Sequence, residues 1–111
     1  MSGRSPAAYG HGEMATYLAE MYMPTTRSGA LRDTARKARA ATEQMTVEGT
    51  PIRYLRTIFL GEDEICFYVY EAGSYEAGSP ETVLEASRRA AIPVDRVVEA
   101  TDIDIESFEE E

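Results

Sequence analysis

Four polar side chains on two predicted strands have the types and the spacing to do chemistry together. Glu20 comes two residues before Tyr22, and Tyr54 comes two residues before Arg56. Side chains two apart in a strand point to the same face of a sheet. A carboxylate, a cation and two phenols on one face could orient an anionic or phenolic ligand. They could also move a proton between carbon and oxygen, with Glu20 as the base and Arg56 stabilising an enolate.

The same four residues also have a structural interpretation. Glu20 and Arg56 could form an ion pair, and the two phenols could fill an interface between subunits, because rings with polar tips suit interfaces. Both interpretations stay open from the sequence. We predict Glu20, Tyr22, Tyr54 and Arg56 as ligand-binding residues, with packing as the alternative, and we expect the loop GSYEAGS (73–79) near the mouth of their site.

The apolar pattern predicts four strands that would position these side chains. The first covers about 14–23 and ends before Pro24, because proline cannot donate a hydrogen bond to a sheet ladder. The second and third form a hairpin that starts at Ile52 and ends near Glu71, with its turn at 60–64. The last strand is DRVVEATDIDI (95–105).

Two helices are predicted between the strands. Ser28 can cap the first, which runs to about Met45, and Ser79 followed by Pro80 can start the second, which runs to about Ala91. The residues expected to be buried are small for the most part, while the basic residues Arg32, Arg36, Lys37 and Arg39 are expected to lie mainly toward solvent. The buried positions are Leu31, Ala35, Ala38, Thr42 and Met45 in the first helix, and Val83, Leu84, Ser87 and Ala90 in the second.

The order strand, helix, strand, strand, helix, strand predicts an α+β, ferredoxin-like βαββαβ fold. This fold has a four-stranded antiparallel sheet with two helices on one face. The other face must then be solvated, paired with a second subunit or used to line a cavity. We expect tyrosines there and predict a dimer that packs sheet on sheet. The tyrosines are Tyr17 or Tyr22, Tyr54, Tyr68 and Tyr70.

The 111 residues fit a single domain, with its ends set apart by composition. Residues 1–12 are rich in Gly, Ser, Pro and Ala and predict a flexible N-terminal segment. The ferredoxin-like domain is expected over 13–105. Residues 106–111 form an acidic C-terminal tail, which predicts a solvated end.

The composition restricts the partners. The net charge of −9 disfavours nucleic acid and anionic membranes, because binding phosphates needs clustered positive charge. No run approaches the ~20 apolar residues of a membrane span, and the start does not resemble a signal peptide. The single cysteine, Cys66, permits no disulfide within the chain and is expected to be a small buried hydrophobe. We therefore predict a cytoplasmic protein without nucleic-acid or membrane partners.

Three blocks of the chain resemble a known family. YLAEMYMP (17–24), IRYLRTIFLGEDEICFYVYEA (52–72) and RRAAIPVDRVVEA (88–100) are similar, in the same order, to the blocks of a small nickel-responsive, ferredoxin-like family with a domain of unknown function. The resemblance covers roughly 15–105. It implies a ferredoxin-like fold, a dimer with the open sheet faces together, and nickel bound largely through histidine.

The metal ligands that the resemblance implies are missing from this chain. Imidazole is the usual nickel ligand, yet the only histidine is His11, in the N-terminal segment. Where relatives tend to carry a Glu-His pair in the second helix, this chain has Glu85 and Ala86. We therefore predict no metal-ligating residues and no cofactor.

The sequence leaves more than one class of function open. The first is a non-catalytic protein that binds a small molecule or a metal ion at the open sheet face of a homodimer. The second is a cofactor-independent cyclase or isomerase that uses Glu, Tyr and Arg on the sheet, which rests on analogy between folds. The third is a subunit that only binds a partner. A phenol-lined cavity favours the first two, and a filled interface favours the third.

Overall fold

The computed structural model describes residues 14–73, 79–101 and 103. The predictions for the N-terminal segment 1–12 with His11, for most of the 73–79 loop and for the acidic tail 106–111 lie outside the described residues. They stay predictions.

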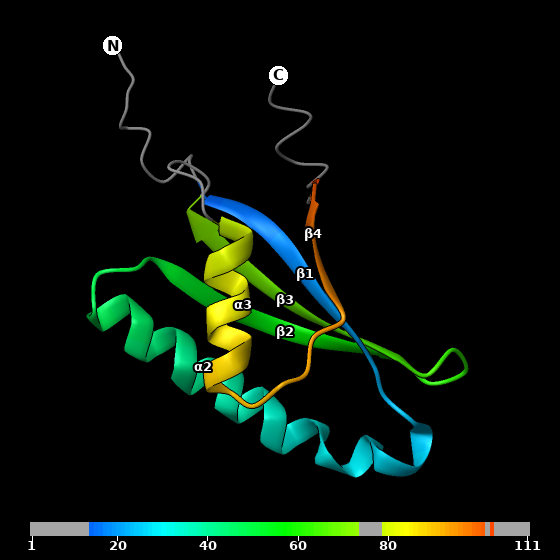
Figure 1. The fold of residues 1–111 in the computed structure, drawn as a ribbon. Helices are drawn as coiled ribbons and strands as arrows, with labels where there is room; N and C mark the ends of the chain where they lie inside the picture. Colours follow the sequence, from blue (N-terminus) through cyan, green and yellow to red (C-terminus); the bar gives the residue numbers. More distant parts are fainter. Residues whose placement is uncertain (1–13, 74–78, 102, 104–111) are drawn as a thin grey trace.

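The described residues form the predicted order of strands and helices (Figure 1). A short 3₁₀ helix, η1, comes before the first α-helix. The bounds are β1 Met14–Tyr22, η1 Thr25–Ala30, α2 Leu31–Val47, β2 Ile52–Leu60, β3 Ile65–Gly73, α3 Ser79–Arg89 and β4 Arg96–Ala100.

The four strands form one antiparallel sheet in the order β2-β3-β1-β4. Figure 1 shows α3 crossing the sheet and α2 running along the side of β2. Buried side chains of both helices belong to one core with alternate residues of the strands, so both helices cover the same face. The α+β class is confirmed, and the arrangement is compatible with the ferredoxin-like fold.

Small side chains let the helices approach the sheet closely. In α2, Ala38, Ala41, Thr42 and Met45 are buried. In α3 the buried positions are Val83, Ala86 and Ser87, and Ala90, the residue after the helix, is buried as well. The prediction that Leu84 is buried is wrong, because the side chain is 40% exposed and Ala86 faces the sheet in its place.

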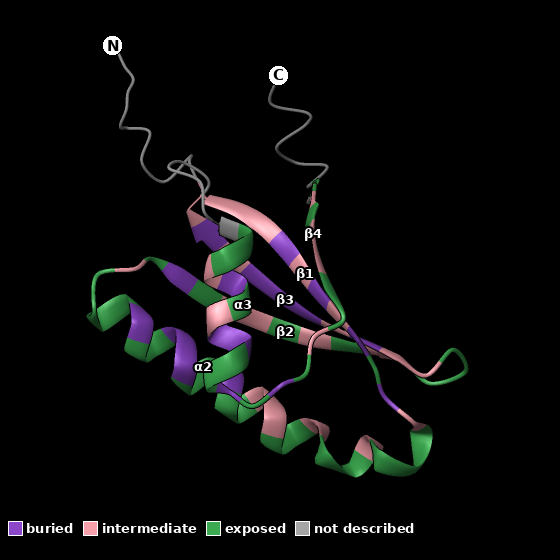
Figure 2. Cartoon of the chain, viewed as in Figure 1, coloured by how far each residue is buried: buried purple, intermediate pink, exposed green. Residues whose placement is uncertain are grey.

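The first helix begins differently from the prediction. Ser28 does not cap an α-helix; it lies inside η1, and α2 starts at Leu31 without a side-chain cap. The amide of Thr25 donates to the Glu64 carboxylate at 2.8 Å, and the amide of Arg27 donates to the Pro24 carbonyl. The helical conformation therefore begins at Thr25, four residues before Gly29, where a Ser28 cap would start it. Figure 2 shows that η1 and the start of α2 are mostly exposed.

Most of the tyrosines expected on the open face of the sheet lie on the covered face instead. Tyr17, Tyr68 and Tyr70 are buried beneath the helices, and Tyr54 packs against the same core. Among the described tyrosines, only Tyr22 lies on the open face, because it alternates along β1 with the buried residues Ala19 and Met21. The alanine side chains of the helices leave room for aromatic rings between helix and sheet, so the phenol rings of the β2–β3 hairpin fill the core.

Candidate functional site

A β-bulge separates two of the four predicted site residues. The pairing of β2 with β3 shifts at Leu55, so Tyr54 pairs with Tyr70 and Arg56 pairs with Val69. Tyr70 and Val69 are neighbours on β3 and point to opposite faces. The expectation that Tyr54 and Arg56 share a face is therefore wrong, because a bulge adds one residue and resets the alternation.

Glu20 of β1 is engaged by a residue of β4, the strand on the side of β1 away from β3. Its carboxylate accepts a hydrogen bond from Nε of Arg96 at 2.7 Å, across the β1–β4 pair. The alternative that paired Glu20 with Arg56 is wrong, since β3 lies between their strands. The structure thus brings Glu20 to an ion pair with Arg96 and away from both Tyr54 and Arg56.

Tyr22 is held by the hairpin turn. Its hydroxyl donates to the Glu64 carboxylate at 3.3 Å, and its amide donates to the Asp95 carboxylate at 2.9 Å. Glu64 has φ 55, a left-handed conformation that aims the side chain back at β1 and η1. The contact with the Thr25 amide, and then those with Thr25 and Tyr22 side chains, lower the pKa of Glu64 against the effect of desolvation. Tyr22 therefore helps to fasten the turn to the end of β1.

Tyr54 and Arg56 do line one surface together, at the outer edge of β2. Two hollows of about 610 and 670 Å³ lie between α2 and β2, and Tyr54 belongs to both. We call them together the α2–β2 groove. The first hollow is lined by Arg39, Thr42, Glu43, Thr46, Val47, Ile52, Arg53, Tyr54 and Leu55, and the second by Ser28, Gly29, Leu31, Arg32, Ala35, Tyr54, Arg56, Thr57 and Phe59.

Positive charge gathers in this groove although the chain is acidic. Arg39 pairs with Glu43 at 3.3 Å, and Arg53 pairs with Glu71 at 3.1 Å. The second hollow contains Arg32 and Arg56, and neither forms an ion pair within the described part of the chain. No carboxylate is among the described residues that line it. The second hollow is therefore a cationic surface.

Sequence reasoning placed Arg32 and Arg39 in solvent and so missed their position in the groove. Both side chains are indeed exposed, but a spacing of seven residues puts them on one side of α2, two turns apart. That spacing was the available signal. What it could not supply was the position of β2 beside this side of the helix.

The aromatic part of the groove rests on the core. Tyr54 packs edge to face on Tyr70, with ring centroids 5.9 Å apart, and its hydroxyl shares a hydrogen bond of 2.5 Å with Oγ1 of Thr57. Tyr54 is thereby fixed at the point where the two hollows meet. Phe59 and Leu31 add apolar surface to the hollow with Arg32 and Arg56.

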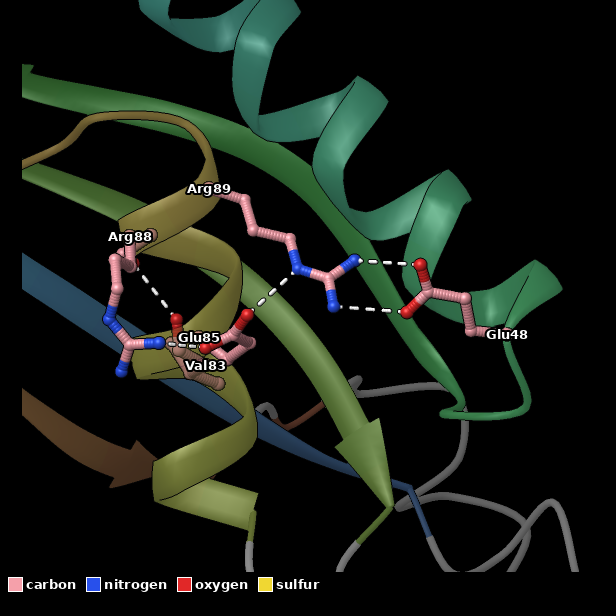
Figure 3. Close-up of polar contacts among 6 residues, drawn as sticks. Glu48, Val83, Glu85, Arg88 and Arg89 are labelled. Atoms are coloured by element: carbon pink, nitrogen blue, oxygen red, sulfur yellow. Dashed lines mark hydrogen bonds and ion pairs between the residues drawn. The ribbon is translucent and has the colours of Figure 1, made fainter.

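A second charged cluster joins the ends of the two helices (Figure 3). Arg89 binds both carboxylate oxygens of Glu48 at 3.0 and 3.2 Å and one oxygen of Glu85 at 2.8 Å, while Arg88 also contacts Glu85. The hydrogen bond from Arg89 and the charges of both arginines lower the pKa of Glu85. Because these carboxylates are matched by guanidinium groups, the cluster connects α2 to α3.

Glu85 and Ala86 stand where the resemblance would place a Glu-His pair. Glu85 belongs to the ion-pair cluster, and Ala86 is fully buried on the side of α3 that faces the core. Within residues 14–73, 79–101 and 103, no group of three or more His, Cys, Asp and Glu side chains could hold a metal ion.

Cys66 has the structural environment expected from the sequence. The side chain is fully buried, and burial raises the pKa of its thiol. A protonated, buried thiol packs as a small apolar group.

No helix among the described residues is both long enough and apolar enough to cross a bilayer. A comparison of the chain with protein-family models, with curated proteins and with solved structures found no significant match.

Proposed function

We propose that the protein is a small ligand-binding protein and that its ligand is an organic anion held in the α2–β2 groove. One observation carries this proposal: Arg32 and Arg56 line one hollow, and no described carboxylate lines it with them. In a chain of net charge −9, a hollow lined by two arginines and by no described carboxylate is a distinct feature of the surface. An anion would supply the missing charge.

The rest of the hollow indicates an organic ligand with an apolar or aromatic body. Phe59, Leu31 and Tyr54 offer ring and aliphatic surface beside the two guanidinium groups. Arginine binds carboxylate and phosphate oxygens through a planar fork of donors. A carboxylate or phosphate on an aromatic ring would therefore use both parts of the hollow.

The geometry favours binding over proton transfer. An isomerase of the kind considered above would need Glu20 close to Arg56, but Glu20 is paired with Arg96 on the far side of β3. Tyr54 shares its hydroxyl with Thr57. The residues that remain around Arg56 can orient an anion by charge and hydrogen bonds.

Titration of ¹⁵N-labelled protein with benzoate and with phenyl phosphate tests the proposal. We expect chemical-shift changes at the amides around Arg32, Arg56 and Phe59. The affinity for both ligands should fall about tenfold or more in Arg32→Gln and in Arg56→Gln, since each change removes a charge-assisted contact. Arg36→Gln is the matched control, because Arg36 lies on the same helix outside both hollows. Shifts confined to other regions at millimolar ligand, or equal weakening in the control, would refute the groove as the site.

We also propose that a second copy of the chain covers the open sheet face, as the sequence led us to expect. The centre of that face is apolar, and all four strands contribute to it. The residues are Leu18, Ile58, Phe67, Val69 and Val98. The ion pairs Arg53–Glu71 and Arg96–Glu20 lie beside it. An apolar centre with a charged border is the composition of a protein interface. Sedimentation equilibrium tests this part of the proposal.

We propose in addition that the protein works in the cytoplasm. The lone, buried Cys66 fits a reducing compartment. Fractionation of the source cells, with the protein followed by antibody, would contradict this if the protein appeared outside the cytoplasmic fraction.

A further inference from the structure

A separate, largely apolar pocket lies at the end of β1. Its volume is about 260 Å³, and we call it the β1-end pocket. Its lining residues come from the end of β1, from η1, from α2 and from the connection between α3 and β4, elements that can be followed in Figure 1. The pocket is lined by Met21, Tyr22, Met23, Pro24, Arg27, Ala30, Thr34, Ala91, Ile92 and Pro93, none of which lines the α2–β2 groove.

The walls of the β1-end pocket are mostly apolar and suit an apolar group. Met21, Met23 and Ile92 are buried, and Pro24 and Pro93 add further apolar surface. Methionine side chains adapt their shape to what they contact. An apolar cavity of about 150 Å³ can hold benzene, so a pocket of this size has room for a somewhat larger molecule.

Most polar groups near the pocket already have partners. The Thr34 hydroxyl donates to the Leu31 carbonyl at 3.0 Å, so in its 2.8 Å contact with Tyr68 it accepts the phenolic proton. The Tyr22 hydroxyl donates to Glu64.

The acids close to the pocket are also engaged. Glu64 accepts from the amide of Thr25, and Asp95 accepts from the amide of Tyr22. The guanidinium of Arg27 forms no ion pair among the described residues, although it lines the pocket. Arg27 is thus a cation at the edge of an apolar cavity, and no carboxylate of residues 14–73, 79–101 and 103 forms an ion pair with it.

We propose that the β1-end pocket binds a small monocarboxylate with an apolar tail. The carboxylate meets Arg27, and the tail lies against Met21, Met23 and Ile92. This site goes beyond the organic-anion site in the groove, because it uses different residues and selects its ligand mainly by the apolar tail. A ligand that lacks the carboxylate loses the contact with Arg27, and a ligand that lacks the tail loses the apolar contacts, so either should bind more weakly.

Hexanoate, acetate and hexanol are the probes that separate these contributions. We expect hexanoate to shift the methyl resonances of Met21 and Met23, and acetate at the same concentration to leave them unchanged. Arg27→Gln should weaken hexanoate binding about tenfold, the effect of losing one charge-assisted contact, and should leave hexanol binding unchanged. Ala30→Phe should weaken both probes by filling the pocket.

Two control variants keep this test apart from the test of the groove. Arg56→Gln removes a groove cation and should not alter the methionine shifts, and Arg36→Gln removes a charge outside all three hollows. If hexanoate shifts the methionines equally in the original protein and in both Arg27→Gln and Ala30→Phe, the proposal is wrong. Absence of any methionine shift at millimolar hexanoate would also overturn it, whatever benzoate does in the groove.

Discussion

Tyr68 and Tyr70 are both fully buried on β3, but their hydroxyl groups have different surroundings. The Tyr68 hydroxyl donates to Oγ1 of Thr34 at 2.8 Å. The Tyr70 hydroxyl has no hydrogen-bond partner within the described part of the chain, and burial raises its pKa although the Ser87 hydroxyl acts in the opposite direction. A buried polar group without a partner destabilises the folded state.

We expect Tyr70→Phe to stabilise the protein by about 1 kcal/mol, because the change removes an unsatisfied hydroxyl and keeps the ring in the core. The packing of Tyr54 on the ring of Tyr70 should persist. Tyr68→Phe is the matched control. It should destabilise the protein by about 1 kcal/mol, because Thr34 loses its donor. Urea unfolding of both variants checks the pair, and a destabilised Tyr70→Phe would show that its hydroxyl has a partner.

The same two variants also test the response to high pH. Burial raises the pKa of Tyr70 to about 12 and raises that of Tyr68 as well, from an ordinary value near 10. The folded state therefore keeps these protons to higher pH than the unfolded state. The titration of these tyrosines therefore leaves the free energy of unfolding unchanged below about pH 10 and lowers it as the pH rises toward about 12. Tyr70→Phe should make this alkaline loss shallower.

The residue types alone could not place the phenols. A tyrosine suits a solvated face, an interface or a core, and the alternation of β2 appeared to put Tyr54 and Arg56 together. The bulge at Leu55 changed the face of one of them, and a bulge has no reliable residue signal unless glycine marks it. Glu20 and Tyr22 do share the open face as expected, but each is engaged by another residue, Arg96 or Glu64.

At the scale of elements, most of the prediction is confirmed. The hairpin with its turn at 60–64, the strand that ends before Pro24 and the helix that starts at Ser79 all follow from turn, proline and capping signals. The η1 helix was missed because its start depends on Glu64, which is 39 residues away from Thr25. Contacts between distant residues are what a local pattern cannot supply.

The alanine face of α2 permits a test of the close approach between helix and sheet. We expect Ala38→Leu to destabilise the protein by about 1–3 kcal/mol, because Ala38 is fully buried and the added carbons must displace neighbours. Ala40→Leu is the matched control, since Ala40 is exposed two residues further along the same helix. It should change the free energy of unfolding by less than about 0.5 kcal/mol. Equal effects of both variants in thermal unfolding would contradict the close packing.

At the scale of the whole molecule, the sheet has one covered face and one open face. Both helices lie over the first, and none of the described elements lies over the second. Its centre is apolar, and Ile58 remains 43% exposed there. Large apolar patches on a protein surface mark sites of association. The open apolar face therefore supports the proposal that a second copy of the chain covers it.

We expect the chain to sediment as a dimer, at twice its mass of 12.3 kDa, at low micromolar concentration. Ile58→Asp should raise the dissociation constant about tenfold or more, because it places a carboxylate in the apolar centre of the contact. Leu84→Asp is the matched control: Leu84 is 40% exposed, but it lies on α3, away from the open face. Circular dichroism shows that each variant is folded before it is compared. A wild-type species of 12.3 kDa, or equal dissociation of both variants, would refute pairing through this face.

The α2–β2 groove lies at the outer edge of β2, so a monomeric protein that still binds benzoate through Arg32 and Arg56 would separate the ligand site from the dimer.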